Sequence, residues 1–169
     1  MKTIEEMKSF PAARKNYRPE KVEKLSEEQM KWFRDAKFGM FIHWGLYSIP
    51  ACGEWMMSEK EMTTEEYHKY FEQFDPVDYD PKKWARLAKK AGMKYAVLTA
   101  KHHYGFSLFD YKLTDYKATN TKAGRDLVRE FVDACREEGL KVGLYFSIID
   151  WHHPDFPKYG DRQHPMRNN

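Results

Sequence analysis

Three polar clusters of the chain each follow directly on an apolar run. They are His43-Trp44-Gly45, Lys101-His102-His103 and Asp150-Trp151-His152-His153. A single histidine after a strand is usually an ordinary surface or core residue, but three such clusters, each with an aromatic residue nearby, favour a shared site. Imidazole nitrogens pair with hydroxyl groups, and aromatic rings pack on the apolar face of a sugar. The clusters therefore predict a site for a polyhydroxylated ligand.

Other kinds of chemistry have weaker support in the sequence. Histidine is a common metal ligand, so a metal-dependent hydrolase using His43, His102, His103 and His152 is one alternative. However, adjacent residues on a strand point to opposite faces, and the chain has no His-x-His motif. It also has no Gly-x-Ser-x-Gly elbow and no glycine-rich phosphate loop. We therefore expect no metal site and no cofactor.

The elements that must position the clusters alternate between strands and helices. Apolar runs predict strands over residues 37–45, 94–100 and 141–151, and amphipathic patterns predict helices over residues 63–74, 80–92 and 124–139. Buried strands separated by helices indicate a parallel sheet, whose carboxyl ends meet at one rim. In barrels of alternating strands and helices this rim carries the active site, so the three clusters are expected to lie together.

Local signals support the predicted helices. Thr63 and Glu66 have the spacing of a capping box. Asp80 suits an N-cap, and Gly92 and Gly139 suit the ends of the second and third helices. The predicted apolar stripe of the second helix consists of Trp84, Leu87 and Ala88.

Composition limits the partners and the setting of the protein. The chain is 41% hydrophobic and 16% aromatic, which supports a packed core. Its 29 basic and 26 acidic residues give a net charge of +3, without a basic run, so no nucleic-acid partner is expected. Apolar runs fall short of the ~20 residues of a membrane span, so no membrane partner is expected either. The N-terminus lacks a signal-peptide core and the chain has two cysteines, which together favour a cytoplasmic setting.

Three segments carry a resemblance to a known family: "KFGMFIHWGLYSIPACGEW", "KYAVLTAKHHYGF" and "KVGLYFSIIDWHHPDFP". They resemble successive strand ends of the α-L-fucosidases of glycoside hydrolase family 29, from about Trp32 to the end of the chain. The resemblance implies the N-terminal part of an α/β, (β/α)8-like (TIM-type) barrel, with about three parallel strands and intervening helices. It also implies retaining hydrolysis of terminal α-L-fucose, with a fucosylated glycan or a small fucoside as the partner. Oligomeric state stays open.

The resemblance further implies seven substrate-binding residues, which are His43, Glu54, Trp55, His102, His103, Tyr145 and Trp151. The three histidines would bond fucose hydroxyls, and Glu54 and Trp55 would contact the sugar from the loop after the first strand. Tyr145 would point inward near the reacting centre, and Trp151 would pack near the rim. One departure is Tyr104, because the family commonly has an acidic residue after the histidine pair.

The resemblance places the catalytic carboxylates outside these residues. A retaining glycosidase needs two carboxylates about 5–5.5 Å apart. In the family, the nucleophile Asp follows the next barrel strand and the acid/base comes later. Both are therefore expected beyond Asn169. Asp150 is not at the family's nucleophile position. We therefore expect a chain that is inactive alone. A non-catalytic sugar-binding protein is the other open alternative.

The expected organisation has three parts. Residues 1–36 would form an N-terminal arm with a short helix after Ser26, residues 37–151 the first part of the barrel, and residues 152–169 a loop leading to the remainder.

Overall fold

The structure, a computed structural model, describes residues 24–156. It divides after Asp35 into two units, which are described separately. Residues 1–23 of the predicted arm (1–36) and residues 157–169 of the predicted loop (152–169) lie outside the described residues, so the predicted domain boundaries stay predictions. None of the helices within residues 24–156 is long and apolar enough to cross a membrane.

The described part of the first unit consists mainly of one short helix, α2 (Glu27–Ala36), whose last residue is the first of the second unit. Ser26 caps it, because the Ser26 hydroxyl accepts from the Gln29 N–H and the Gln29 side chain accepts from the Ser26 N–H. This confirms the helix predicted after Ser26.

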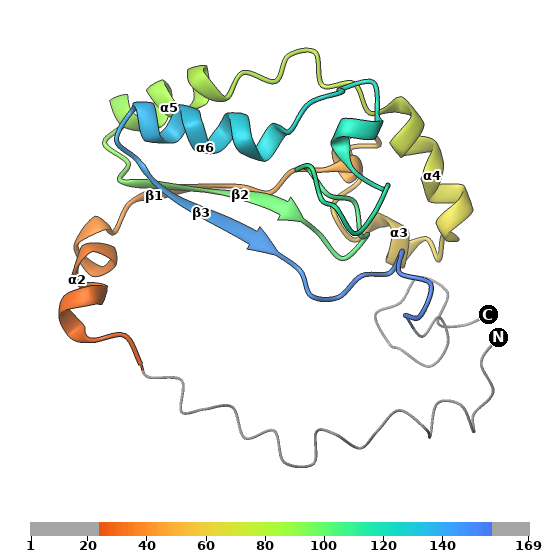
Figure 1. The fold of residues 1–169 in the computed structure, drawn as a ribbon, viewed down its shortest axis with the longest axis horizontal. Coiled ribbons are helices and arrows are strands. Elements are labelled where there is room, and N and C mark those ends of the chain that lie inside the picture. Colours follow the sequence, from red (N-terminus) through yellow and green to blue (C-terminus); the bar gives the residue numbers. More distant parts are fainter. Residues whose placement is uncertain (1–23, 157–169) are drawn as a thin grey trace. The chain divides into compact units, whose positions relative to one another are not determined.

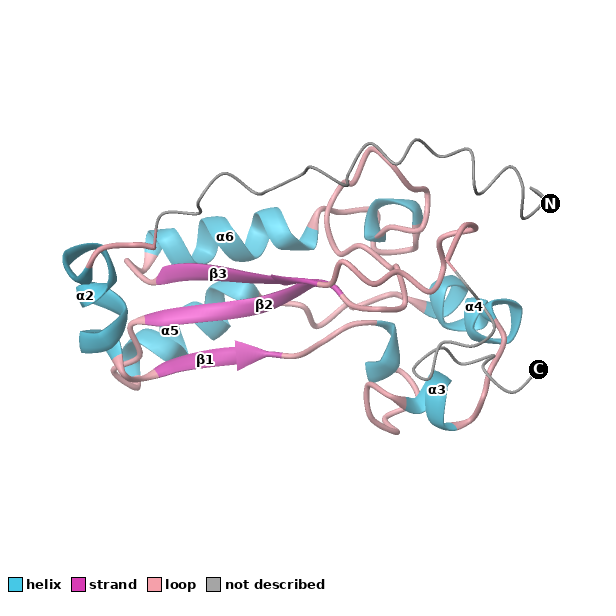
Figure 2. Ribbon diagram, turned by 90° about the horizontal axis from the view of Figure 1, so that it is seen from below, coloured by secondary structure: helices cyan, strands magenta, loops and turns pink. Residues whose placement is uncertain are grey.

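The second unit is built on a parallel sheet of the order β1-β2-β3 (Figures 1 and 2). The strands are β1 (Gly39–Ile42), β2 (Tyr95–Lys101) and β3 (Lys141–Phe146). Phe41 lies opposite Val97, and Val97 lies opposite Gly143, so the three strands run in register from one end. All three therefore end at the same side of the sheet, as the sequence predicts.

Three longer helices connect and cover the strands: α4 (Thr64–Gln73), α5 (Pro81–Lys90) and α6 (Leu127–Glu137). The predicted capping box is present, with Thr63 and Glu66 each bonded to the other's backbone N–H. Asp80 caps α5, and Asp126 caps α6. Gly92 and Gly139 follow α5 and α6 with φ of 85° and 69°, a backbone conformation that favours glycine and ends a helix.

The core lies between the sheet and two helices on one of its faces. In both views α5 and α6 lie on the same side of the sheet (Figures 1 and 2). Buried side chains from strands and helices fill the space between them: Ala85, Ala88, Ala96, Leu98, Ala100, Leu127, Phe131 and Cys135. One prediction is wrong here. Leu87 is 57% exposed, because the buried face of α5 is formed by Pro81, Ala85 and Ala88.

The opposite face and the edges of the sheet are open among the described residues. Side chains alternate along a strand, so Phe41, Thr99 and Tyr145 share the face away from α5 and α6. Phe41 on β1 and Leu144 on β3 are both exposed. An open parallel sheet covered by helices on one face is the arrangement of a barrel segment, which confirms the predicted fold class.

The segments after the strands carry short helices that the sequence patterns did not predict. These are η1 (Leu46–Ser48), α3 (Met56–Glu59) and η2 (Ala118–Asn120). With α4, α3 lies beyond the carboxyl ends of the strands (Figures 1 and 2). The third strand is also shorter than predicted. It ends at Phe146, and the apolar Ile148 is 94% exposed in the loop that follows.

Candidate active-site rim

Three predicted site residues from three different strands converge at the carboxyl ends of the sheet. The His43 and His102 ring centroids are 5.1 Å apart. The Tyr145 ring centroid lies 5.8 Å from that of His43 and 6.1 Å from that of His102. Their spacing in the sequence is wide, so the parallel register of β1, β2 and β3 is what brings them together.

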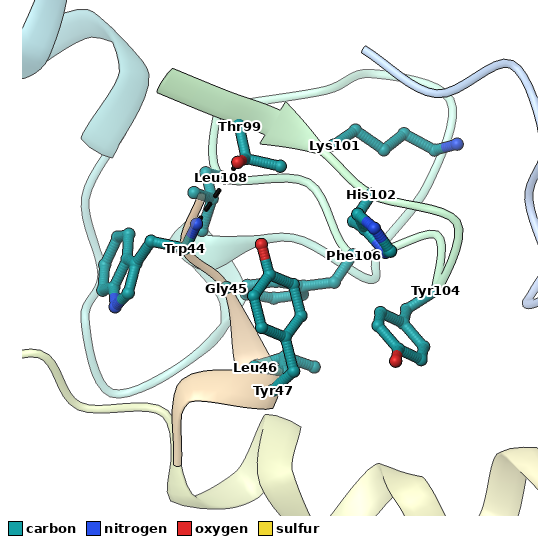
Figure 3. Close-up of a pocket in the computed structure, with 10 residues that line it drawn as sticks. All are labelled: Trp44, Gly45, Leu46, Tyr47, Thr99, Lys101, His102, Tyr104, Phe106 and Leu108. Atoms are coloured by element: carbon teal, nitrogen blue, oxygen red, sulfur yellow. Dashed lines mark hydrogen bonds between the residues drawn. The ribbon is translucent and has the colours of Figure 1, made fainter. Parts of the chain in front are cut away.

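Thr99 holds the backbone on both sides of His43. The Thr99 hydroxyl donates to the Ile42 carbonyl at 3.0 Å and accepts from the Trp44 N–H at 3.2 Å. Figure 3 shows the second of these bonds, at the end of β2. A buried threonine of β2 therefore fixes the peptide that carries the His43 side chain.

The histidine pair lies just past β2 rather than within it. Because β2 ends at Lys101, the alternation of a strand no longer applies, and the His102 and His103 ring centroids are only 4.4 Å apart. Burial, with His103, His43 and Lys101 nearby, lowers the pKa of His102 to about 3. Burial and the nearby Lys101 also lower the pKa of His103. Both imidazoles are therefore neutral near pH 7, and a neutral imidazole can both donate and accept a hydrogen bond.

Buried aromatic side chains pack against His102, the first histidine of the pair. The His102 ring contacts those of Tyr47 and Tyr104, with centroids 5.2 and 5.1 Å away, as Figure 3 shows. The Tyr104 ring in turn stacks on Tyr67 at 4.7 Å. Tyr104 is 3% exposed, so the residue that departs from the family pattern fills a buried aromatic layer.

Two tryptophans contact the second histidine of the pair. The Trp55 ring centroid lies 5.4 Å from that of His103, and the Trp151 centroid lies 5.5 Å from it. Trp55 is partly exposed, whereas Trp151 is 2% exposed and packs behind Trp55 and His103. Glu54 is partly buried, and its charge adds to burial in raising the pKa values of Tyr47 and Tyr104. All seven predicted residues thus lie at or just behind one rim.

A largely buried ion pair joins the end of β2 to the loop after β3. Lys101 Nζ lies 3.0 Å from Asp150 Oδ2, and the Lys101 side chain is 3% exposed. The other carboxylate oxygen, Oδ1, accepts from the N–H groups of His152 and His153, each at 3.0 Å. Asp150 is therefore held by one ion pair and two backbone hydrogen bonds. In Figure 3 Lys101 points away from Tyr47.

The described part of the chain contains no group of three or more His, Cys, Asp or Glu side chains arranged to hold a metal ion. A cavity of about 10 Å³ lies between Tyr47, Thr99 and His102, enough space for about one water molecule. A sugar cannot enter it. The space available for a ligand is the open side of the rim, where His43 is exposed and His103 and Tyr145 are partly exposed.

Sequence reasoning missed two residues that position the rim. Thr99 and Ser147 each occur within a run of apolar residues, and both are buried. Thr99 is hydrogen-bonded to the segment after β1, and Ser147 to the segment after β2. A polar residue within a buried run was the available signal for both.

The parallel strands with intervening helices define the class of the fold. They are strand–helix units of the α/β-barrel kind, with imidazoles and aromatic rings at the strand ends. The family model "Alpha-L-fucosidase" matches residues 5–169. The chain therefore belongs to the α-L-fucosidase family, whose characterised members are glycoside hydrolases.

Individual relatives agree with the family match. The chain is 36% identical to the tissue alpha-L-fucosidase of Rattus norvegicus over 82% of its own length and 34% of that protein. Among solved structures it is similar to alpha-L-fucosidase isoenzyme 1 from Paenibacillus thiaminolyticus, with 69% identity, a TM-score of 0.81, and coverage of 83% of this chain and 33% of that one. It is also similar to AlfC of Lactobacillus casei in complex with alpha-L-fucose product, with 41% identity, a TM-score of 0.71, and coverage of 74% of this chain and 43% of that one. The chain spans about a third of the curated relatives that it matches.

Proposed function

We propose that this chain supplies the fucose-binding rim of a retaining α-L-fucosidase. The proposed ligand is the terminal α-L-fucose of a fucosylated glycan or small fucoside. His43, His102 and His103 would bond its hydroxyls, and Glu54, Trp55 and Tyr145 would complete the contacts. Because Trp151 is buried, we assign it the supporting role of holding Trp55 and His103 in place.

The convergence of His43, His102 and Tyr145 carries this proposal. Their rings come from three strands and lie within about 6 Å of one another, on the open face of the sheet. The imidazole of His102 stays neutral, so it offers one donor and one acceptor nitrogen, which suits hydroxyl groups. The fucose-bound structure of AlfC, a similar protein, supports the identity of the sugar.

A binding test uses the chain with two mirror-image sugars. Calorimetric titration of the 169-residue chain with L-fucose is expected to show binding, while D-fucose, of equal polarity and opposite configuration, is expected to bind at least about tenfold more weakly. His43→Ala should weaken the binding of L-fucose, and Lys82→Ala, on the exposed surface, should leave it unchanged. Equal affinity for the two sugars would contradict the proposal.

We also propose that the catalytic carboxylates lie beyond Asn169, so that these 169 residues alone bind but do not hydrolyse. The contacts of Asp150 with Lys101 and two backbone N–H groups support this, because they give this carboxylate a structural role between β2 and the loop after β3. Incubation with an aryl α-L-fucoside should release no chromophore above buffer. Release would mean that a carboxylate pair exists within the chain, and Glu54 and Asp150 would be the first pair to replace.

The two alternatives predict different results. A non-catalytic sugar-binding protein would bind L-fucose and stay inactive in any longer polypeptide that contains this chain. A metal-dependent hydrolase would lose activity with a chelator and would contain metal when purified.

A further inference from the structure

The hydroxyl of Ser147 lies between the ring of His103 and a backbone carbonyl. Ser147 Oγ is 2.5 Å from His103 Nδ1 and 3.0 Å from the carbonyl oxygen of Ile149. Ser147 is the first residue after β3, and it is buried. Both contacts therefore form away from bulk water.

The number of protons decides which group donates. A serine hydroxyl carries one proton, and a carbonyl oxygen can only accept. The hydroxyl proton therefore goes to Ile149, and Oγ must accept from the ring of His103. This requires a proton on Nδ1 of His103.

His103 also favours its neutral form in this setting. Burial, followed by the nearby Lys101 and His43, lowers its pKa. The chargeable groups facing it from the adjacent elements are Lys101, whose ammonium is paired with Asp150, and the imidazoles of His43 and His102. A neutral ring with its proton on Nδ1 has a free lone pair on Nε2. Within residues 24–156 no hydrogen bond to Nε2 is present.

The position of Ser147 is itself fixed by the residue at the end of β2. The Ser147 N–H donates to the carbonyl of Lys101 at 2.9 Å, and the Ser147 carbonyl accepts from Lys101 Nζ at 3.2 Å. Farther along, the Trp151 N–H donates to the carbonyl of His103 at 2.7 Å. These bonds tie the loop after β3 to the segment that carries His103, and so they keep the Ser147 hydroxyl next to Nδ1.

We propose that Ser147 is a positioning residue that fixes the Nδ1–H tautomer of His103, so that His103 offers Nε2 to the ligand as a hydrogen-bond acceptor. The matching ligand group is a hydroxyl that donates. A carboxylate or phosphate ester has no proton to donate to Nε2 and would be disfavoured there. The identity of that ligand as fucose rests on the proposed function, but the tautomer does not.

The imidazole nitrogens of the chain can report the tautomer directly. Long-range proton–nitrogen NMR spectra of the 15N-labelled 169-residue chain at pH 7.5 distinguish a protonated from an unprotonated ring nitrogen. The His103 signals are identified by their loss in His103→Gln. The expected result is a protonated Nδ1 and an unprotonated Nε2. A protonated Nε2 in the unaltered chain would overturn the proposal, whether or not the chain binds fucose.

Two variants separate positioning from simple packing. In Ser147→Ala the Nδ1 partner is lost, so the His103 signals should move toward the Nε2–H form and the affinity for L-fucose should fall about tenfold. In Ser147→Thr, which keeps a hydroxyl, both should stay close to the original. An unchanged tautomer in Ser147→Ala would overturn the proposal. The predicted tautomer without binding of L-fucose would instead contradict the proposed function alone.

Discussion

Lys101, at the end of β2, and Asp150, in the loop after β3, form a largely buried ion pair with Nζ and Oδ2 3.0 Å apart. Lys101 also donates to the Ser147 carbonyl and comes directly before the histidine pair. The pair therefore joins the loop after β3 to the segment that carries His102 and His103. An ion pair of this kind is costly to break, because removal of one partner leaves the other charge buried and unpaired.

Asp150→Asn should destabilise the chain strongly. It leaves the Lys101 ammonium buried without its counter-charge. Because the Asp150 side chain is 26% exposed, we expect a loss of about 2–3 kcal/mol, below the ~3–5 kcal/mol of a fully buried pair. Urea unfolding measures the change. Glu137→Gln, in the exposed pair with Lys82, is the matched control and should cost less than about 1 kcal/mol. Equal costs for the two variants would show that the Lys101–Asp150 pair adds little.

Gly105→Ala should also destabilise the loop after β2. Gly105 has φ of 82°, and an added Cβ would collide with the Asp150 carboxylate and His152 Cβ. Gly124 is a matched control, because its φ is 59° and an added Cβ meets nothing within 4 Å. Gly124→Ala should cost about 1 kcal/mol for the backbone conformation alone, and Gly105→Ala at least about 2 kcal/mol more. Similar midpoints of urea unfolding for the two variants would contradict the close approach of Gly105 to Asp150.

Stability should fall as the pH drops below about 6.5, the ordinary pKa of an unfolded histidine. The folded pKa of His102 is lowered to about 3, so between these values the unfolded chain binds more protons than the folded chain. The free energy of unfolding then rises with pH up to about 6.5 and levels off above it, with a slope of at most ~1.4 kcal/mol per pH unit from this residue. Unfolding measured from pH 5 to 8 tests the slope. His102→Gln should reduce it, and an unchanged slope in that variant would contradict the burial of a neutral His102.

Thr99→Val should loosen the peptide that carries His43. The variant keeps the shape of the side chain but leaves the Trp44 N–H without its hydroxyl acceptor. Leaving such a group unsatisfied costs about 1–3 kcal/mol. Thr99→Ser keeps the hydroxyl and should recover much of the loss in urea unfolding. A valine variant as stable as the original chain would mean that the two bonds of Thr99 contribute nothing net.

The sequence patterns predicted the features that depend on neighbouring residues, which are the position of the rim and the ends of the helices. Polar clusters after apolar runs located the rim, and Thr63, Asp80 and Gly92 marked helix ends, because capping and glycine chemistry depend on nearby residues. The third strand was predicted too long. The segment from Ser147 to Ile149 has residue types that are common in strands. However, the Ser147 side chain is hydrogen-bonded to His103, and the Ile148 side chain faces solvent.

The supports of the site escaped prediction because they join distant residues. Ser147 and His103 are 44 residues apart in the sequence, and nothing local relates them. Tyr104 was noticed as a departure from the family pattern, but its place in a buried stack with Tyr67 depends on the packing of α4. Such pairings depend on how the strands and helices pack together, which no local pattern encodes.

NMR titration of the histidine side chains with L-fucose tests the proposed rim most directly. The imidazole signals of His43, His102 and His103 should shift with the sugar concentration, because these rings line the proposed site. The signals of His68, whose ring packs on Phe71 and Tyr116 rather than on the proposed site residues, should stay in place. Saturable shifts confined to the three rim histidines, and absent with D-fucose, are the predicted result. Shifts elsewhere, or equal shifts with both sugars, would contradict a fucose site at this rim.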